Sequence, residues 1–268
     1  MHALTRPLAA LFCTTLLTAA AVAQRPDPAS VEMTYRDKND FTEALQAVPP
    51  SAIFRMEGYY LWDPSVIQVG DTYHLFASRW AQSTGTEGWK KCHVIRATSK
   101  NLFGPYEFAG VVLDPATHPW AKEGVHNPKI TRVGGRYLIY HIGIPGYVTG
   151  FAWADNIEGP WEPVTKPVIP TNNPAVLVHP DGSAYAVGKF KPKPVKDGNV
   201  DDYMDAYTAP RIDGPFTKIG GDGSRLPYNF ELEDPTIWWA NNQYNILCLD
   251  WEAKATGITK AFTYYTST

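Results

Sequence analysis

The sequence predicts an all-β protein of the five-bladed β-propeller type, with about four blades present and the last one incomplete. The first repeated pattern begins with a polar residue, or Trp62 in the first copy, followed by Asp or Asn and then Pro. A short β-branched run, a tight turn and a run that starts with Tyr complete it. The four copies occupy residues 62–73, 126–137, 172–185 and 233–244. A second pattern, Gly-Pro-aromatic, starts at even spacing at residues 104, 159 and 214. Repeats of this length that hold several strands are typical of propeller blades.

Each copy of the first pattern predicts a β-hairpin that opens at its proline. Pro lacks a backbone N–H, which costs least at the first position of a strand, and Gly, Asn or Asp suits the turn. Four blades follow at about residues 58–115, 120–168, 170–220 and 231–268 of a propeller domain that spans residues 58–268. Their expected strands are about 63–69, 72–78, 92–98 and 106–112; then 128–133, 136–141, 148–154 and 161–164; then 174–179, 183–189, 203–208 and 216–219; and last 235–240, 243–249 and 258–265.

The end of the chain falls one residue before the position expected for a fourth Gly-Pro-aromatic copy. We therefore expect a fragment or a truncated gene product, whose fourth blade lacks its outer strand and whose fifth blade is missing. An open propeller would expose apolar blade surface. A natural four-bladed ring is the alternative.

The N-terminus predicts export. Residues 1–23 resemble a signal peptide, with Arg6, an apolar stretch over residues 8–22 and Ala21-Val22-Ala23 as a cleavage site. The mature protein is then secreted or periplasmic, with no membrane association after signal removal. Residues 24–57 form an N-terminal extension, in which residues 39–45 could start a short helix. Cys92 and Cys248 remain in the mature chain and are predicted to be free and buried.

Composition narrows the classes of partner. Aromatic residues make up 13% of the chain, which suits a folded all-β protein and argues against disorder. The formal net charge is −3, so nothing points to nucleic acid.

Hairpin topology predicts where the chemistry lies. The residues at the start of each first strand and at the end of each second strand share one face, at the mouth of the central channel. The polar and aromatic side chains that meet there are Trp62, Asp63, Arg79, Trp80, His126, Asn127, His141, Asn173, Lys189, Glu233, Asp234, Asp250 and Trp251. Carboxylates for proton transfer, polar groups for hydroxyls and indoles for ring faces suit a carbohydrate substrate.

With these motifs the chain resembles the five-bladed propeller glycoside hydrolases of the furanosidase superfamily, family 43 and its relatives in families 32, 62, 117 and 130. The resemblance covers about residues 58–266. It implies that Asp63 of Trp62-Asp63-Pro64 is the general base and that Glu233 of Glu233-Asp234-Pro235 is the general acid. The family has an Asp where this chain has Asn173. The implied activity is hydrolysis of a glycosidic bond in an extracellular or periplasmic poly- or oligosaccharide. Inversion is expected if the two carboxyl groups lie about 6.5–9.5 Å apart, and retention if they lie about 5–5.5 Å apart.

Several alternatives stay open at this point. Asn127 and Asn173 could be turn starters, and Asp234 could exchange roles with Glu233. His126, with Glu123, could bind a metal or act as the acid. Arg79 and Lys189 could bind an anionic sugar substituent or pair with a carboxylate. No cofactor is expected to be required, although the central channel could hold a structural divalent cation. The rival functions are a non-catalytic carbohydrate-binding propeller and a scaffold, and the oligomeric state is unknown.

Overall fold

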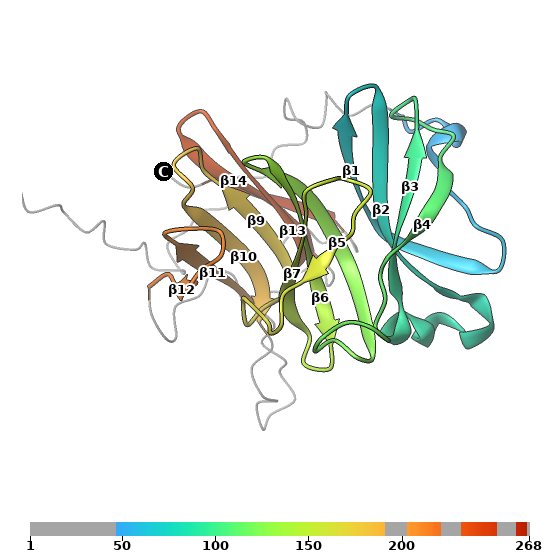
Figure 1. Cartoon of the computed structure of the whole chain (residues 1–268). Coiled ribbons are helices and arrows are strands. Elements are labelled where there is room, and N and C mark those ends of the chain that lie inside the picture. Colours follow the sequence, from blue (N-terminus) through green and yellow to red (C-terminus); the bar gives the residue numbers. More distant parts are fainter. Residues whose placement is uncertain (1–46, 191–202, 221–231, 251–260, 267–268) are drawn as a thin grey trace, which may run out of the picture. The chain divides into compact units, whose positions relative to one another are not determined.

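The computed structural model describes residues 47–190, 203–220, 232–250 and 261–266. Four antiparallel sheets follow one another along the chain (Figure 1). The first holds β1 (Tyr59–Val69), β2 (Thr72–Ala81), β3 (His93–Ser99) and β4 (Glu107–Leu113). The second holds β5 (Gly124–Val133), β6 (Arg136–Ile144), β7 (Val148–Ala154) and β8 (Glu162–Pro163). The third holds β9 (Asn172–Val178), β10 (Ala184–Phe190), β11 (Tyr203–Ala209) and β12 (Thr217–Lys218). The fourth holds β13 (Leu232–Ala240), β14 (Gln243–Asp250) and β15 (Ala261–Thr266).

Consecutive sheets pack face to face through three apolar clusters. Phe76 and Val94 of the first sheet meet Tyr137 and Ile139 of the second. The second and third sheets share a cluster around Phe151, and Val187 and Met204 of the third pack against Leu232 and Cys248 of the fourth. Innermost strands β1, β5, β9 and β13 contact one another in that order. This is the packing of propeller blades and confirms the predicted fold class, with a fourth sheet of three strands in the part of the chain described.

The other face of the first sheet carries its own cluster. Leu75, Ala77 and Ile95 are buried there under Phe54, from the stretch that follows a short 3₁₀ helix, η2 (Pro50–Ala52). Among the described residues, no strand of the first sheet pairs with a strand of the fourth. The expected signal peptide and the helix near residues 39–45 lie outside the described residues.

The predicted starts of the innermost strands were wrong. The Pro residues do not open these strands; β1, β5, β9 and β13 begin earlier, at Tyr59, Gly124, Asn172 and Leu232. Each Asx-Pro pair instead forms a β-bulge, where two residues face one residue of the second strand. A bulge leaves a strand residue without a ladder partner, so Pro is tolerated there.

The bulge also explains why Asp or Asn precedes each proline. The residue before Pro has a left-handed backbone in all four sheets, with φ of 52° at Asp63, 51° at Asn127, 45° at Asn173 and 47° at Asp234. Asp and Asn accept this conformation better than other residues with a Cβ. A bulge re-aims the side chains beside it. The same local fold therefore presents two side chains per blade at the same place.

Candidate active site

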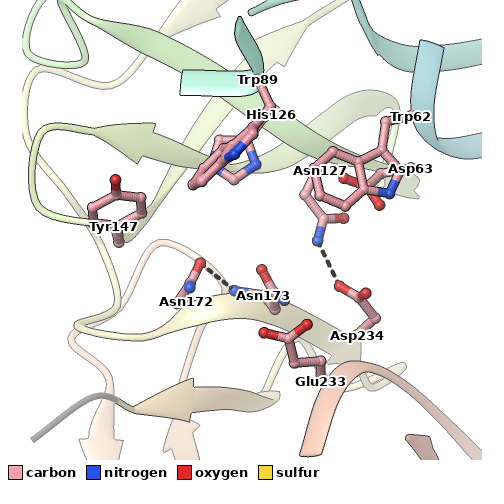
Figure 2. A pocket seen from close by; sticks show the side chains of 10 residues that line it. All are labelled: Trp62, Asp63, Trp89, His126, Asn127, Tyr147, Asn172, Asn173, Glu233 and Asp234. Atoms are coloured by element: carbon pink, nitrogen blue, oxygen red, sulfur yellow. Dashed lines mark hydrogen bonds between the residues drawn. The ribbon is translucent and has the colours of Figure 1, made fainter. Parts of the chain in front are cut away.

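The four bulges meet at one pocket of about 370 Å³ (Figure 2). Eight of its ten lining residues are the bulge residue and the residue before it, one pair from each sheet. The pairs are Trp62 with Asp63, His126 with Asn127, Asn172 with Asn173, and Glu233 with Asp234. Trp89 and Tyr147 complete the lining. Asp63 and Glu233 thus line the same pocket, as the sequence predicted.

Asp63 is the carboxyl group most strongly perturbed toward its neutral form. Burial, and then the negative charges of Asp234 and Glu233, raise its pKa to about 7, while the Lys129 ammonium opposes them. Burial and Glu233 also raise the pKa of Asp234, while Lys129, a hydrogen bond from Asn127 and Lys189 lower it. At neutral pH these carboxyl groups therefore hold fewer negative charges than their number suggests.

Glu233 has a different environment. Its carboxylate forms an ion pair with the Lys189 ammonium, and the Lys189 side chain is completely buried. A buried ammonium is tolerated only with a partner that neutralises it. The charges of Lys189 and Glu233 thus neutralise each other. Lys189 lies behind Glu233 and is not among the pocket-lining residues.

Two buried polar atoms at the pocket have no hydrogen-bond partner among the described residues. They are Nε2 of His126 and Oδ1 of Asn127. Burial lowers the pKa of His126 to about 4, so its imidazole is neutral near pH 7. Unpaired buried polar groups are costly unless a ligand or water satisfies them. Both atoms are covered by protein, so they do not by themselves mark a contact with a bound molecule.

Aromatic rings form one side of the pocket. The ring of Trp89 lies 6.3 Å from that of Trp62 and 6.0 Å from that of Tyr147, measured between centroids. It also packs edge-on against His126 at 5.4 Å. Figure 2 shows Trp89 and Tyr147 on the side away from Glu233 and Asp234. Apolar ring faces opposite carboxylates are what a sugar, with one apolar and one hydroxyl-bearing surface, requires.

Like Lys189, three further residues that were predicted for the site do not line the pocket: Arg79, Trp80 and His141. The Arg79 guanidinium lies 4.4 Å from the ring centroid of Tyr59 and 5.1 Å from that of Phe108, so it is not beside Asp63 as expected. Trp80 is buried behind Trp62, with ring centroids 5.9 Å apart.

His141 is the third of these residues, and it is fully buried. Its ring stacks on Trp120 and its Nε2 lies 3.4 Å from Nε2 of His118. The reason for its position is register: the bulge at Asn127-Pro128 faces His141, so that strand position points away from the mouth. The side chain of Asp250 and the whole of Trp251 lie outside the described residues.

Sequence reasoning missed Trp89 and Tyr147, and it did not include Asn172 among the candidate site residues. Trp89 lies on a 3₁₀ helix, η4 (Thr86–Lys91), which follows a shorter one, η3 (Gln82–Thr84), between β2 and β3. Tyr147 lies in the turn between β6 and β7. Both connections start where a second strand returns to the mouth, which was the available signal. Neither residue belongs to the repeat, so the pattern could not select it.

In the part of the chain that the structure describes, no group of three or more His, Cys, Asp or Glu side chains is arranged to hold a metal ion. The described residues also contain no helix long and apolar enough to cross a membrane. The expectations on cofactors stay predictions. Cys92 and Cys248 are free and buried, which confirms that prediction.

Fold and site together define a β-propeller with a carboxylate- and aromatic-lined pocket where its innermost strands meet. Solved glycoside hydrolases share this fold. A family 117 glycoside hydrolase of the marine bacterium Zobellia galactanivorans matches with a TM-score of 0.59 and 17% identity, over 78% of this chain and 67% of that one. The GH43_1 enzyme from Xanthomonas citri matches with a TM-score of 0.58 and 17% identity, over 79% and 72%.

The Xanthomonas citri enzyme complexed with xylotriose matches equally well, with a TM-score of 0.58 and 19% identity over 79% of this chain and 71% of that one. No model of a known protein family matches the chain, and no curated protein sequence does. The likeness therefore establishes the fold, and the chemistry has to be argued from the pocket.

Proposed function

We propose that this protein hydrolyses a glycosidic bond in an extracellular or periplasmic poly- or oligosaccharide, with Asp63 and Glu233 as the proton-transferring pair. The observation that carries the proposal is the convergence of the four bulges. The pocket that they form gathers three carboxyl groups, three amides, one imidazole and three aromatic rings. A volume of about 370 Å³ fits the end of a glycan chain. Export rests on residues 1–23 and is part of the proposal.

The charge states of the pair are unequal, as acid–base catalysis requires. Asp63, with its pKa raised to about 7, carries a proton up to neutral pH, whereas the Glu233 carboxylate is paired with the Lys189 ammonium. In this proposal Asp63 is the proton donor and Glu233 the base. This order is the reverse of the one that the family resemblance implies. The order that the resemblance implies would be favoured by a cation beside Asp63 and by like charges alone around Glu233. Instead, Arg79 is not beside Asp63, and the Lys189 ammonium pairs with Glu233.

The proposed reaction proceeds with inversion, in which one carboxyl group protonates the leaving oxygen and the other activates water on the opposite face of the sugar. The configuration of the first-formed product, followed by proton NMR before mutarotation, tests this part. A β-anomer from an α-linked substrate, or the converse, supports inversion. An unchanged anomer would indicate a covalent intermediate instead.

The central test is hydrolysis by the full chain. Xylotriose is a reasonable first substrate because the similar Xanthomonas citri enzyme was solved with it; arabino- and galacto-oligosaccharides complete the panel. Products are separated by chromatography for the wild type, Asp63→Asn and Glu233→Gln. We expect each substitution to lower kcat by about 10²–10⁴. Binding without turnover in the wild type would reject the proposal and favour a carbohydrate-binding propeller, a rival that the amides of Asn127 and Asn173 support.

A further inference from the structure

Three aromatic side chains form a continuous side of the pocket, which we call the aromatic wall: Trp62, Trp89 and Tyr147. Trp89 is half-buried between its two neighbours, whereas Trp62 is 44% and Tyr147 37% exposed. Figure 2 shows that Trp62 lies beside Asp63 and that Trp89 and Tyr147 extend away from it. The wall therefore begins at a proposed catalytic carboxyl group and continues beyond it.

The position of Trp89 is fixed by glycines. A Cβ on Gly88 would lie 2.4 Å from Cδ1 of Trp80 and closer still to Thr84, so only Gly lets η4 pack this tightly. A Cβ on Gly124 of β5 would lie 2.4 Å from the Lys90 carbonyl oxygen. The helix that carries Trp89 is thus held between the first and second sheets. The Trp89 indole therefore has a fixed position in the wall of the pocket.

The backbone conformation of Tyr147 indicates that its side chain is also held in a fixed position. Its backbone φ is 52°, in the left-handed region that a bulky residue rarely adopts. Glycine and asparagine would be the residues of choice at such a turn position. Strain of this kind persists where the surroundings require the side chain in that place. Here it directs the phenol ring to Trp89.

We propose that Trp89 and Tyr147 form a subsite for a second sugar ring and make the protein selective for a glycan chain over a simple monosaccharide glycoside. The inference rests on the proposed function. The proton-transferring pair must flank the bond between two rings, so one ring lies against Asp63, Glu233 and Trp62. The part of the wall that extends away from Asp63 can then only contact the neighbouring ring. Apolar sugar faces stack on indole and phenol rings in this way.

The test is the dependence of binding on chain length. Isothermal titration calorimetry on the full-length Asp63→Asn variant, which turns over slowly, gives Kd for xylose, xylobiose and xylotriose and for the matching arabinose and galactose series. We expect the disaccharide of at least one series to bind about tenfold or more tightly than its monosaccharide. In that background Trp89→Ala should remove the gain, and Trp89→Phe should keep most of it. Trp239→Ala removes an indole on β13 that does not line the pocket and should change nothing.

The outcomes separate this inference from the proposed function. Loss of the same factor for mono- and disaccharide in Trp89→Ala would place Trp89 in the first subsite and overturn the proposal. Equal affinity for both chain lengths, or no binding by any series, would overturn it as well. Chain-length-dependent binding through Trp89 without hydrolysis by the wild type would uphold the subsite and reject the catalytic function. Thermal melts of the two Trp89 variants establish that both are folded.

Discussion

The side-chain amide of Asn127 donates a 3.0 Å hydrogen bond to Oδ1 of Asp234 and so joins the second sheet to the fourth across the pocket (Figure 2). Both residues occupy the left-handed bulge position of their sheets. The donated hydrogen bond favours ionised Asp234, and the charge of Asp234 in turn raises the pKa of Asp63. The amide at position 127 therefore influences which carboxyl group holds the proton.

Asn127→Asp should make stability strongly dependent on pH. The substitution keeps a residue that accepts the left-handed backbone but replaces a donor with a carboxyl group that faces Asp234. At pH 8 the like charges should lower the free energy of unfolding by about 1–3 kcal/mol, and at pH 5 most of this loss should disappear. Urea unfolding measures both. Asn241→Asp, at an exposed turn with a φ of 53°, is the matched control and should show no such dependence. Equal losses at both pH values would mean that charge is not the cause.

Asp63→Asn should raise stability at alkaline pH. The folded-state pKa of about 7 lies above the ordinary value of 3.8, so the folded state binds more protons between these values. Stability therefore falls as pH rises from about 4 through 7, and the loss is complete above 7. Relative to the wild type, Asp63→Asn should gain on the order of 2–4 kcal/mol at pH 8.5 compared with pH 5. The comparison of variant with wild type cancels the opposite dependence of buried His118, His126 and His141, whose pKa values are lowered. A constant difference across pH would contradict the raised pKa.

Lys189→Met should destabilise the protein by about 3 kcal/mol, because it leaves the Glu233 carboxylate without the ammonium that neutralises it. Adding Glu233→Gln should recover part of the loss, since the double variant also lacks the carboxylate that the Lys189 ammonium neutralised. Lys100→Met, which breaks an exposed ion pair with Asp71, is the control and should cost less than about 1 kcal/mol. If the double variant is no more stable than Lys189→Met alone, the two side chains act independently.

The leaving group of the substrate should distinguish the acid from the base. An enzyme without its general acid still cleaves a glycoside whose leaving group needs no protonation, such as a dinitrophenolate. Asp63→Asn should therefore lose about 10²–10⁴ in kcat/KM on an oligosaccharide but much less on the dinitrophenyl glycoside. Glu233→Gln should lose activity on both. The opposite pattern would restore Asp63 as base and Glu233 as acid, the order that the family resemblance implies.

Tyr147→Asn should be at least as stable as the wild type while it weakens glycan binding. Asn accepts a φ of 52° more readily than Tyr, so the substitution relieves strain on the order of 1 kcal/mol. Tyr147→Phe keeps both ring and strain and serves as the control for binding. Denaturant unfolding measures the stability of each variant, and isothermal titration calorimetry measures its affinity for the glycan. A clearly less stable Tyr147→Asn would show that the ring supports the fold and not a subsite.

The sequence could predict the sheets because each blade repeats its own hairpin and turn signals. It placed Asp63 and Glu233 in one pocket for the same reason. It could not predict the bulges, because Asx-Pro at a strand start and Asx-Pro inside a bulged strand have the same letters. Because of this error, His141 was predicted to face the mouth of the channel, whereas the observed strand register directs it away from the mouth. Lys189 was placed on the correct strand and Arg79 directly after the expected end of its strand, but their partners depend on packing between elements distant in sequence.

In the four bulges, the backbone conformation and the functional groups of the pocket depend on different residues. Each needs only Asp or Asn followed by Pro, so the residue in front of that pair is free of the local conformational demand. Those four positions hold an indole, an imidazole, an amide and a carboxylate in this chain, at Trp62, His126, Asn172 and Glu233. A change at any one of them exchanges one functional group in the pocket while the strand that holds it keeps its path. Substitution at any of these four positions can therefore change the specificity of the pocket while the backbone of the bulge stays the same.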